Sequence, residues 1–306
     1  MLKGSMEHYS PFYQLLISLL LVLGSFLLAM FVGTVIALLL FDINIFTDTQ
    51  TLNIYSDAVN ISVLKFYQSI YSTGMFIIPP FIIAFLFNKD VLKSLFLHKG
   101  AKLPVALMAT FIIIISLPMI NLLGQVNSYL SLPEFMSGIE TWMKDSEEQA
   151  KIVTQKFLIM NSYSDLWVNL IVIALIPAIG EELLFRGVLQ GIFAKLTKNI
   201  HWGIIITAFL FAALHMQFYG LLPRMAMGIL FGYLLVWSGS LWAPIIAHLA
   251  NNAMAVITQY YILKGSLPKE VETIGTNGNY WISGLISIVL VLILLHIFRA
   301  ICKRET

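Results

Sequence analysis

The residues best suited to chemistry in this chain are two adjacent glutamates, Glu181 and Glu182. They interrupt an apolar run, residues 166–193, that is long enough to cross a lipid bilayer. A charged side chain at the centre of a bilayer costs about 2.5 to 3.5 kcal/mol, so a helix retains one only where other groups offset that cost. The pair therefore predicts a functional site with partners on neighbouring helices.

Histidine and asparagine side chains in two later apolar segments are the candidate partners. His215 ends one apolar stretch, and His248 interrupts another together with Asn251 and Asn252. A little over 30 residues separate Glu181 from His215, and His215 from His248, which is about one helix out and one helix back. We therefore expect the three side chains at similar depth in adjacent helices.

Spacing along the helix separates the roles of the two glutamates. Glu182 and Arg186 are four residues apart with the acid first, so they can form an ion pair along one helix face. Glu181 points about 100° away around the same helix. Glu182 is therefore predicted to brace the helix with Arg186, and Glu181 to face a cavity. His248 and Asn252 are also four apart and share a face.

Proline and glycine indicate how these helices bend and pack. Pro177 and Pro244 each lie four residues before a site residue, where each removes one backbone hydrogen bond and can kink its helix. Glycines at small-xxx-small spacing predict close helix packing. They are Gly187, Gly191, Gly228 and Gly232.

A carboxylate, two imidazoles and a carboxamide in one partly wet cavity suit the hydrolysis of an amide bond. Glu181 can take a proton from a water molecule that His215 helps to hold. His248 and Asn252 can donate hydrogen bonds to the oxyanion that forms when the water attacks, a contact worth about 3 to 4 kcal/mol per donor. This chemistry requires no serine or cysteine nucleophile.

Three segments carry a resemblance to a known family. Residues 181–186 read Glu-Glu-Leu-Leu-Phe-Arg, residues 211–215 read Phe-Ala-Ala-Leu-His, and residues 248–252 read His-Leu-Ala-Asn-Asn. In this order and spacing they resemble the signature motifs Glu-Glu-x-x-x-Arg, Phe-x-x-x-His and His-x-x-x-Asn of the CAAX protease and bacteriocin-processing family, also called the Abi family.

The resemblance implies an intramembrane endopeptidase that acts on a membrane-associated peptide or a prenylated protein. In it, Glu181 and His215 match the water-activating pair, and His248 and Asn252 match the oxyanion-stabilising pair. Parts of the family are thought to mature bacteriocins or confer self-immunity. Two other classes stay open: a proton-coupled transporter, which would favour internal repeats that we do not find, and a non-catalytic membrane scaffold.

The family is often labelled a metalloprotease, so zinc is the alternative to a metal-free mechanism. Glu181, His215 and His248 could serve as two histidines and a glutamate around zinc with an open water position. However, the chain has no His-Glu-x-x-His helix, and Asn252 suits an oxyanion better than a metal. We therefore favour a mechanism without a cofactor.

The composition places these residues in an integral membrane protein. Hydrophobic residues make up 59% of 306 positions, charged residues make up only 11%, and the mean hydropathy is +0.87. The single cysteine, Cys302, excludes an internal disulfide framework. No basic cluster suggests a nucleic-acid partner, so we expect lipid and a membrane-associated substrate.

Apolar segments of about 20 residues predict an all-α polytopic bundle with about eight transmembrane helices. An amphipathic surface helix is expected from Ser137, which begins a sequence of capping-box form. We predict a single integral membrane domain over 1–306, with a motif-bearing catalytic core at 166–262. The predicted spans are 13–41, 64–88, 104–125, 166–194, 202–219, 223–238, 241–263 and 279–299.

Basic residues orient this bundle, because positive charge is enriched in cytoplasmic loops. With both termini in the cytoplasm of a cell-membrane protein, one face collects most of the lysines and arginines and the other collects most of the acids. The basic face holds Lys3, Lys89, Lys93, Lys99, Lys102, Lys195, Lys198, Arg299, Lys303 and Arg304.

Overall fold

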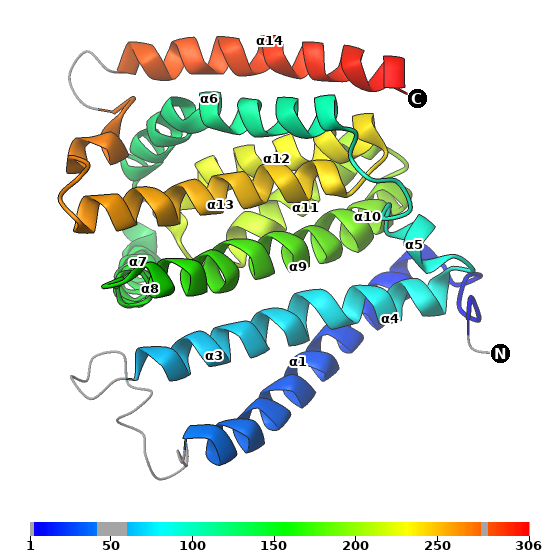
Figure 1. The fold of residues 1–306 in the computed structure, drawn as a ribbon. Helices are drawn as coiled ribbons and strands as arrows, with labels where there is room; N and C mark the ends of the chain where they lie inside the picture. Colours follow the sequence, from blue (N-terminus) through cyan, green and yellow to red (C-terminus); the bar gives the residue numbers. More distant parts are fainter. Residues whose placement is uncertain (1–2, 42–59, 277–280, 306) are drawn as a thin grey trace.

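The computed structural model describes residues 3–41, 60–276 and 281–305, which form helices and their connections without a strand in those ranges (Figure 1). The predicted all-α polytopic bundle is confirmed. Its main elements are α1 (Pro11–Phe41), α3 (Ile61–Ser72), α4 (Ile78–Phe87), α5 (Val91–Ser94), α6 (Leu103–Ser128), α7 (Ser137–Phe157), α8 (Tyr163–Asn169), α9 (Ile176–Leu184), α10 (Gln190–Thr197), α11 (Ile200–Ala213), α12 (Leu221–Ser238), α13 (Trp242–Leu263) and α14 (Trp281–Glu305).

Six of the eight predicted spans are helices long and apolar enough to cross a membrane, within the described ranges. The other two differ for separate reasons. Helix α11 has only 14 residues, and α13 has 22 residues but carries His248 and two asparagines that make it less apolar. The six spans are Pro11–Phe41, Ile61–Phe87, Leu103–Ser128, Tyr163–Thr197, Phe218–Ser238 and Trp281–Arg304.

Two of these spans are α-helices interrupted by π-helical turns. One turn, Thr73–Ile77, joins α3 to α4, and two turns, Leu170–Leu175 and Phe185–Leu189, lie on either side of α9. The span from Tyr163 to Thr197 is therefore α8, α9 and α10 in series. Such turns are rare and occur often at functional sites.

The two prolines behave differently. Pro177 lies at the start of α9, directly after a π-helical turn, so the predicted irregularity beside Glu181 is present. The predicted kink at Pro244 is wrong. Helix α13 begins at Trp242, so Pro244 occupies the first turn, where its missing N–H would have no partner within the helix.

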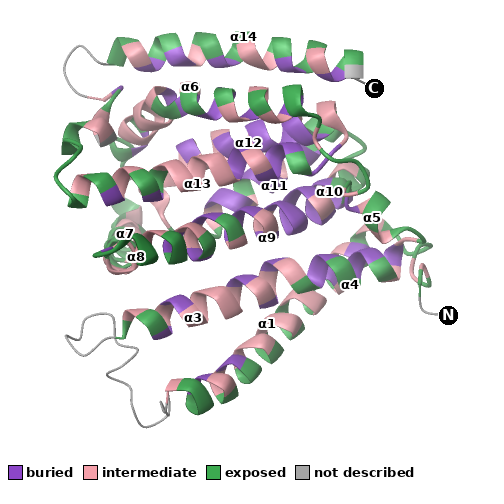
Figure 2. Ribbon diagram, in the orientation of Figure 1, coloured by how far each residue is buried: buried purple, intermediate pink, exposed green. Residues whose placement is uncertain are grey.

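Helices α9 and α13, which carry the first and third motifs, lie with α12 in the interior of the bundle, whereas α1 lies at its edge (Figures 1 and 2). Helix α14 packs along α6 on the opposite side. Helices α12 and α11 approach closely, since a Cβ at Gly228 would lie 2.8 Å from the Cβ of Ala208. The predicted close packing holds there, but it is wrong for Gly191, where a Cβ would meet nothing within 4 Å.

The predicted amphipathic helix is α7, and none of its residues is buried. Ile139 and Trp142 expose about half of their surface. The predicted capping box is wrong, because Met136 caps this helix without a side-chain hydrogen bond and Ser137 is already helical. A complete capping box instead begins α8, where Ser162 and Asp165 bond each other's backbone N–H groups.

Candidate active site

A buried cluster joins the first and third motifs. Oε1 of Glu182 accepts hydrogen bonds from Nη1 of Arg186 at 2.8 Å and from Nδ1 of His248 at 2.9 Å. Both side chains of the ion pair are almost fully buried, with 0% of Glu182 and 1% of Arg186 exposed. The predicted pair is therefore present, and the same carboxylate also positions a histidine from α13.

Arg186 links this cluster to the neighbouring helices. Its Nη2 donates to the carbonyl oxygen of Gly228 at 3.2 Å. The guanidinium also lies over the ring of Phe211, 4.7 Å from its centroid, and 5.3 Å from that of Phe231. Cation–π contact and hydrogen bonds together stabilise a charge that would otherwise be costly to bury. One arginine thus ties the first motif to α11 and α12.

The contact with Glu182 fixes the tautomer of His248. Because ionised Glu182 only accepts, Nδ1 of His248 carries the hydrogen, and Nε2 of the neutral ring is an acceptor. The ring also stacks on Phe231, with centroids 5.0 Å apart and planes at 20°. A carboxylate that orients an imidazole in this way serves the same purpose as the acid of a catalytic triad.

Glu181 lies on the other side of this imidazole. Its Oε2 is 3.8 Å from Nε2 of His248, and it is buried without a hydrogen-bond partner among the described residues. A separation of this size is too long for a direct hydrogen bond. The two glutamates thus take different nitrogens of His248, as their different directions around α9 require.

His215 follows α11 and contacts its own backbone. Its Nδ1 donates to the carbonyl oxygen of Phe211 at 2.8 Å, which leaves Nε2 of the neutral ring as an acceptor. The ring packs edge-on against Phe211, with centroids 5.0 Å apart. Phe211 also packs edge-on against His248 at 5.9 Å. The first residue of the second motif therefore separates and orients the two histidines.

Asn252 contacts backbone that Pro177 leaves without its usual partner. Because proline has no N–H, the carbonyl of Ile173, four residues earlier, receives no α-helical hydrogen bond from it. Nδ2 of Asn252 donates to this carbonyl at 3.5 Å, and Oδ1 accepts from Asn251 at 3.1 Å. One N–H of the Asn252 amide is thereby placed, and the other remains for a ligand.

A cavity of about 240 Å³ brings together most of the predicted site. Glu181 is not among the residues that line it, so the structure places this glutamate behind His248 rather than on the wall. The lining residues are Ile120, Phe211, His215, Gly220, Pro223, Arg224, Met227, Phe231, His248, Asn251 and Asn252.

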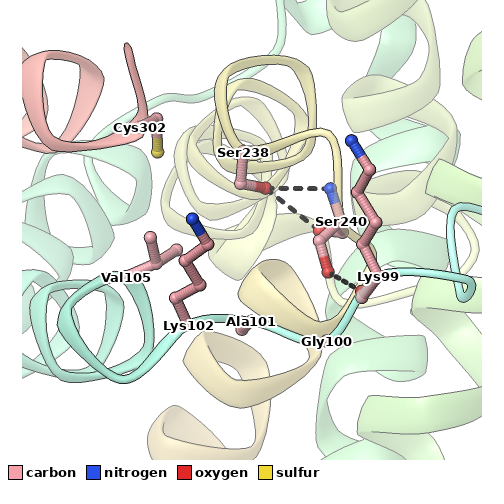
Figure 3. Close-up of a pocket in the computed structure, with 8 residues that line it drawn as sticks. All are labelled: Lys99, Gly100, Ala101, Lys102, Val105, Ser238, Ser240 and Cys302. Carbon is pink, nitrogen blue, oxygen red and sulfur yellow. Dashed lines mark hydrogen bonds between the residues drawn. The ribbon is translucent and has the colours of Figure 1, made fainter. Parts of the chain in front are cut away.

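A larger cavity, of about 420 Å³, lies at the far end of α12 (Figure 3). It contains none of the motif residues. Ser238, Ser240 and Lys99 meet there, where Oγ of Ser240 donates to the carbonyl oxygen of Lys99 at 2.7 Å. Its size alone does not make it the active site, since the convergent polar groups lie in the smaller cavity.

The zinc alternative was tested on the geometry of its candidate ligands. Across the described ranges, no three histidine, cysteine, aspartate or glutamate side chains lie close enough to hold one metal ion. As arranged here, Glu181, His215 and His248 do not form a zinc site.

Arg224 is the cavity residue that the sequence analysis missed. It lies inside the predicted span 223–238, for which no catalytic or binding residue was predicted. The signal was available, because an arginine inside an apolar span is as costly as a glutamate and equally indicates a function.

The fold and the cluster define a multi-pass helical membrane protein with a buried glutamate, arginine and histidine site. Comparison with known proteins agrees with this class. Residues 163–254, which contain all three motifs, match the family model described as Type II CAAX prenyl endopeptidase Rce1-like. The resemblance to the CAAX protease and bacteriocin-processing family is thereby confirmed for this segment.

Two curated proteins of Bacillus subtilis strain 168 are similar to part of the chain. The putative membrane peptidase YdiL is 31% identical over 101 residues, which cover 33% of this chain and 41% of that protein. The uncharacterized protein YpbD is 32% identical over 90 residues, which cover 28% of this chain and 43% of that protein. The chain therefore spans less than half the length of either relative. No solved structure matches significantly.

Proposed function

We propose that this protein is an intramembrane endopeptidase that hydrolyses a peptide bond with a water activated by Glu181. One observation carries the proposal: Glu182 binds Arg186 and His248 at once, which joins two motifs into one buried cluster within the family-matched segment. A purely structural ion pair would not need a histidine from another helix beside an adjacent, unpartnered carboxylate.

The roles follow from the hydrogen positions. Glu181 takes a proton from a water molecule beside its carboxylate. His215 accepts a second hydrogen bond from the water at Nε2, on the cavity side. As the water oxygen bonds to the amide carbonyl carbon, charge develops on the carbonyl oxygen. The oxyanion then re-forms the carbonyl as the C–N bond breaks, and the proton held by Glu181 passes to the leaving amine.

Two donors stabilise the developing oxyanion. Asn252 supplies its remaining N–H. His248 donates from Nε2, and because Nδ1 already donates to Glu182, this requires the doubly protonated ring. Glu182 and Glu181 on either side of the ring compensate the charge of that form. The two donors come from one helix face, so their relative position is fixed by α13.

The substrate and setting complete the proposal. We infer that the substrate is a membrane-associated peptide or a prenylated protein, and that cleavage serves bacteriocin maturation or self-immunity. Membrane lipid is the second partner, and we infer no nucleic-acid partner. We place the protein in the cell membrane with both termini in the cytoplasm, because the basic residues gather on that face. In support, α1 begins and α14 ends at the same end of the bundle (Figure 1).

The test compares purified full-length wild type with Glu181→Gln, His215→Ala and His248→Ala in lipid nanodiscs. A farnesylated CAAX peptide and a panel of unmodified membrane-proximal peptides serve as substrates, and mass spectrometry locates each cut. We expect all three variants to lose at least about 100-fold in rate. Glu148→Gln, an exposed position on α7, is the matched control and should retain the wild-type rate.

Two further measurements separate the alternatives. Full activity after demonstrated removal of bound metal is expected, whereas activity that disappears with the metal and returns with zinc would establish the zinc mechanism. If no peptide is cut, proton flux into proteoliposomes is measured. Flux that Glu181→Gln abolishes would favour the transporter, and its absence together with absent cleavage would favour the scaffold.

A further inference from the structure

Arg224 is a second arginine of the site, and it differs from Arg186 in its partners. It lies in the first turn of α12 and lines the cavity beside His215, His248 and Asn252. Unlike Arg186, which is 1% exposed and sealed against aromatic rings, Arg224 is only half-buried and borders open space.

The partners of Arg224 are neutral. Its guanidinium donates to the backbone carbonyl oxygen of Gln217 at 3.3 Å and to Oε1 in the side chain of the same residue. Within the described part of the chain, no carboxylate forms a salt bridge with it. The acidic groups whose charges reach it are Glu147 and Glu181, both beyond ion-pair distance. Its charge is therefore held in place without being neutralised by contact.

The chain is shaped to hold this guanidinium. A Cβ at Gly220 would collide with Nη1 of Arg224, so a side chain at this position would displace it. The same loop is fixed from outside, because the backbone N–H of Tyr219 donates to Glu147 of α7 at 3.2 Å. The rings of Phe218 and Trp142 pack with centroids 5.1 Å apart. Gln217 and Gly220 thus place the guanidinium of Arg224 at the cavity.

We propose that Arg224 binds a carboxylate of the peptide substrate and thereby selects an anionic peptide. This inference rests on the proposed function and adds its substrate class. An arginine offers a planar set of donors that suits a carboxylate, and only part of that set is used by Gln217. Among the described residues that line the cavity, no other is an arginine or a lysine.

Two sources of carboxylate fit this chemistry: the C-terminus of the peptide and an aspartate or glutamate side chain near the cut. A third reading is structural, in which Arg224 only holds the Gln217 loop or balances Glu181. These readings differ in one measurable respect. If Arg224 binds a carboxylate of the peptide, a substitution of Arg224 weakens the binding of peptides that carry this carboxylate more than the binding of peptides that lack it. The structural reading predicts the same effect on both kinds of peptide.

The experiment measures binding rather than turnover, so its result does not depend on hydrolysis. Three fluorescent farnesylated peptides share one apolar sequence. The first has a free C-terminal carboxylate and no acidic side chain, and the second is the same peptide with a C-terminal amide. The third is the amide with one glutamine near the C-terminus replaced by glutamate. Each is titrated by anisotropy against the full-length protein in phosphatidylcholine nanodiscs. The proteins are wild type, Arg224→Gln, Arg224→Lys and Arg299→Gln, the last a matched charge loss on α14.

We expect wild type to bind one anionic peptide about 10- to 100-fold more tightly than the neutral amide, the range of a charge-assisted hydrogen-bonded pair. The preferred peptide identifies the source of the carboxylate. Arg224→Gln should bring the ratio close to one, Arg224→Lys should reduce it in part because lysine lacks the planar fork, and Arg299→Gln should leave it unchanged.

Three outcomes would overturn the inference. Wild type could bind the anionic and neutral peptides equally, or bind none; Arg224→Gln could keep the wild-type ratio; or Arg299→Gln could lower it as much. If Arg224→Gln does not fold, the affinity ratio of Arg224→Lys and the preference of the wild type still test the inference. A carboxylate-dependent ratio without any peptide cleavage would retain the binding site while rejecting the hydrolytic function, so the two proposals fail separately.

Discussion

Two apolar spans of this bundle, α1 and the span from Tyr163 to Thr197, differ strongly in how much of their surface is buried. Only 6% of the most apolar 18-residue stretch of α1 is buried, whereas 56% of the corresponding stretch of the Tyr163–Thr197 span is buried. The first faces outward with its leucines exposed, and the second holds Glu181, Glu182 and Arg186 in the interior (Figure 2). Hydropathy therefore identifies membrane helices, and interior polar contacts identify which of them carries the site.

The largest expected effect lies inside that interior span, at Glu182. Glu182→Gln keeps the shape but leaves the buried charge of Arg186 without its counter-charge, so we expect a loss of about 3 to 5 kcal/mol of stability. Unfolding in an SDS titration measures it. Glu181→Gln is the matched neighbour and should cost much less, because Oε2 of Glu181 has no hydrogen bond to lose. Equal losses at both positions would contradict the division between brace and base.

Asn252 should affect the reaction more than the fold. Its bond to Ile173 is long, at 3.5 Å, so Asn252→Ala should cost no more than about 1 kcal/mol of stability. As an oxyanion donor, its loss should lower the rate about 10²- to 10³-fold. Gln259→Ala on the same helix, outside the residues that line the cavity, controls for a general change in α13. A rate loss that only matches the loss of folded protein would remove Asn252 from the chemistry.

The glycines test whether close packing is confined to the interior. At Gly228 a new Cβ would lie 3.0 Å from the Cα of Ala208, so Gly228→Ala should destabilise by about 1 to 3 kcal/mol through overpacking. At Gly191 nothing lies within 4 Å, and Gly191→Ala should instead stabilise α10 by up to about 1 kcal/mol. The same SDS titration measures both. If Gly228→Ala also raised the stability, the packing of α11 against α12 would be looser than described.

The smallest effect is expected on α1. Leu20 is 68% exposed, so Leu20→Ala should change stability by no more than about 0.5 kcal/mol. Leu234 is 0% exposed in α12, and Leu234→Ala should cost about 2 to 5 kcal/mol. If Leu20→Ala were as costly as Leu234→Ala, α1 would belong to the packed core and the contrast between the two spans would fail.

The sequence predicted what depends on local spacing. The Glu182 and Arg186 pair follows from four residues on a helix, and the bundle itself follows from hydropathy. The contact between Glu182 and His248 joins residues 66 apart, and the direction of the histidine depends on how α13 packs, which no local pattern encodes. The length of α11 was also not predicted. The predicted span ran from 202 to 219, but the helix ends at Ala213.

The sequence predicted site residues where glutamate, histidine or asparagine interrupts an apolar run. Arg224 also interrupts one, but it was not predicted as a site residue. Its neutral partners come from a turn, Gln217 to Gly220, whose geometry depends on contact with α7. The π-helical turns beside α9 were also not predicted. Pro177 signalled only that one hydrogen bond would be missing, and the structure shows that Asn252 uses the released carbonyl.

The most direct test of the central claim is the cleavage rate of one panel peptide by wild type and Glu181→Gln, at equal amounts of folded protein in nanodiscs. Because Glu181 is proposed as the base, the variant should lose about 10²- to 10⁴-fold in rate while its unfolding transition stays close to that of wild type. Equal rates for the two proteins would show that the peptide is cut without Glu181 and would contradict the proposed mechanism.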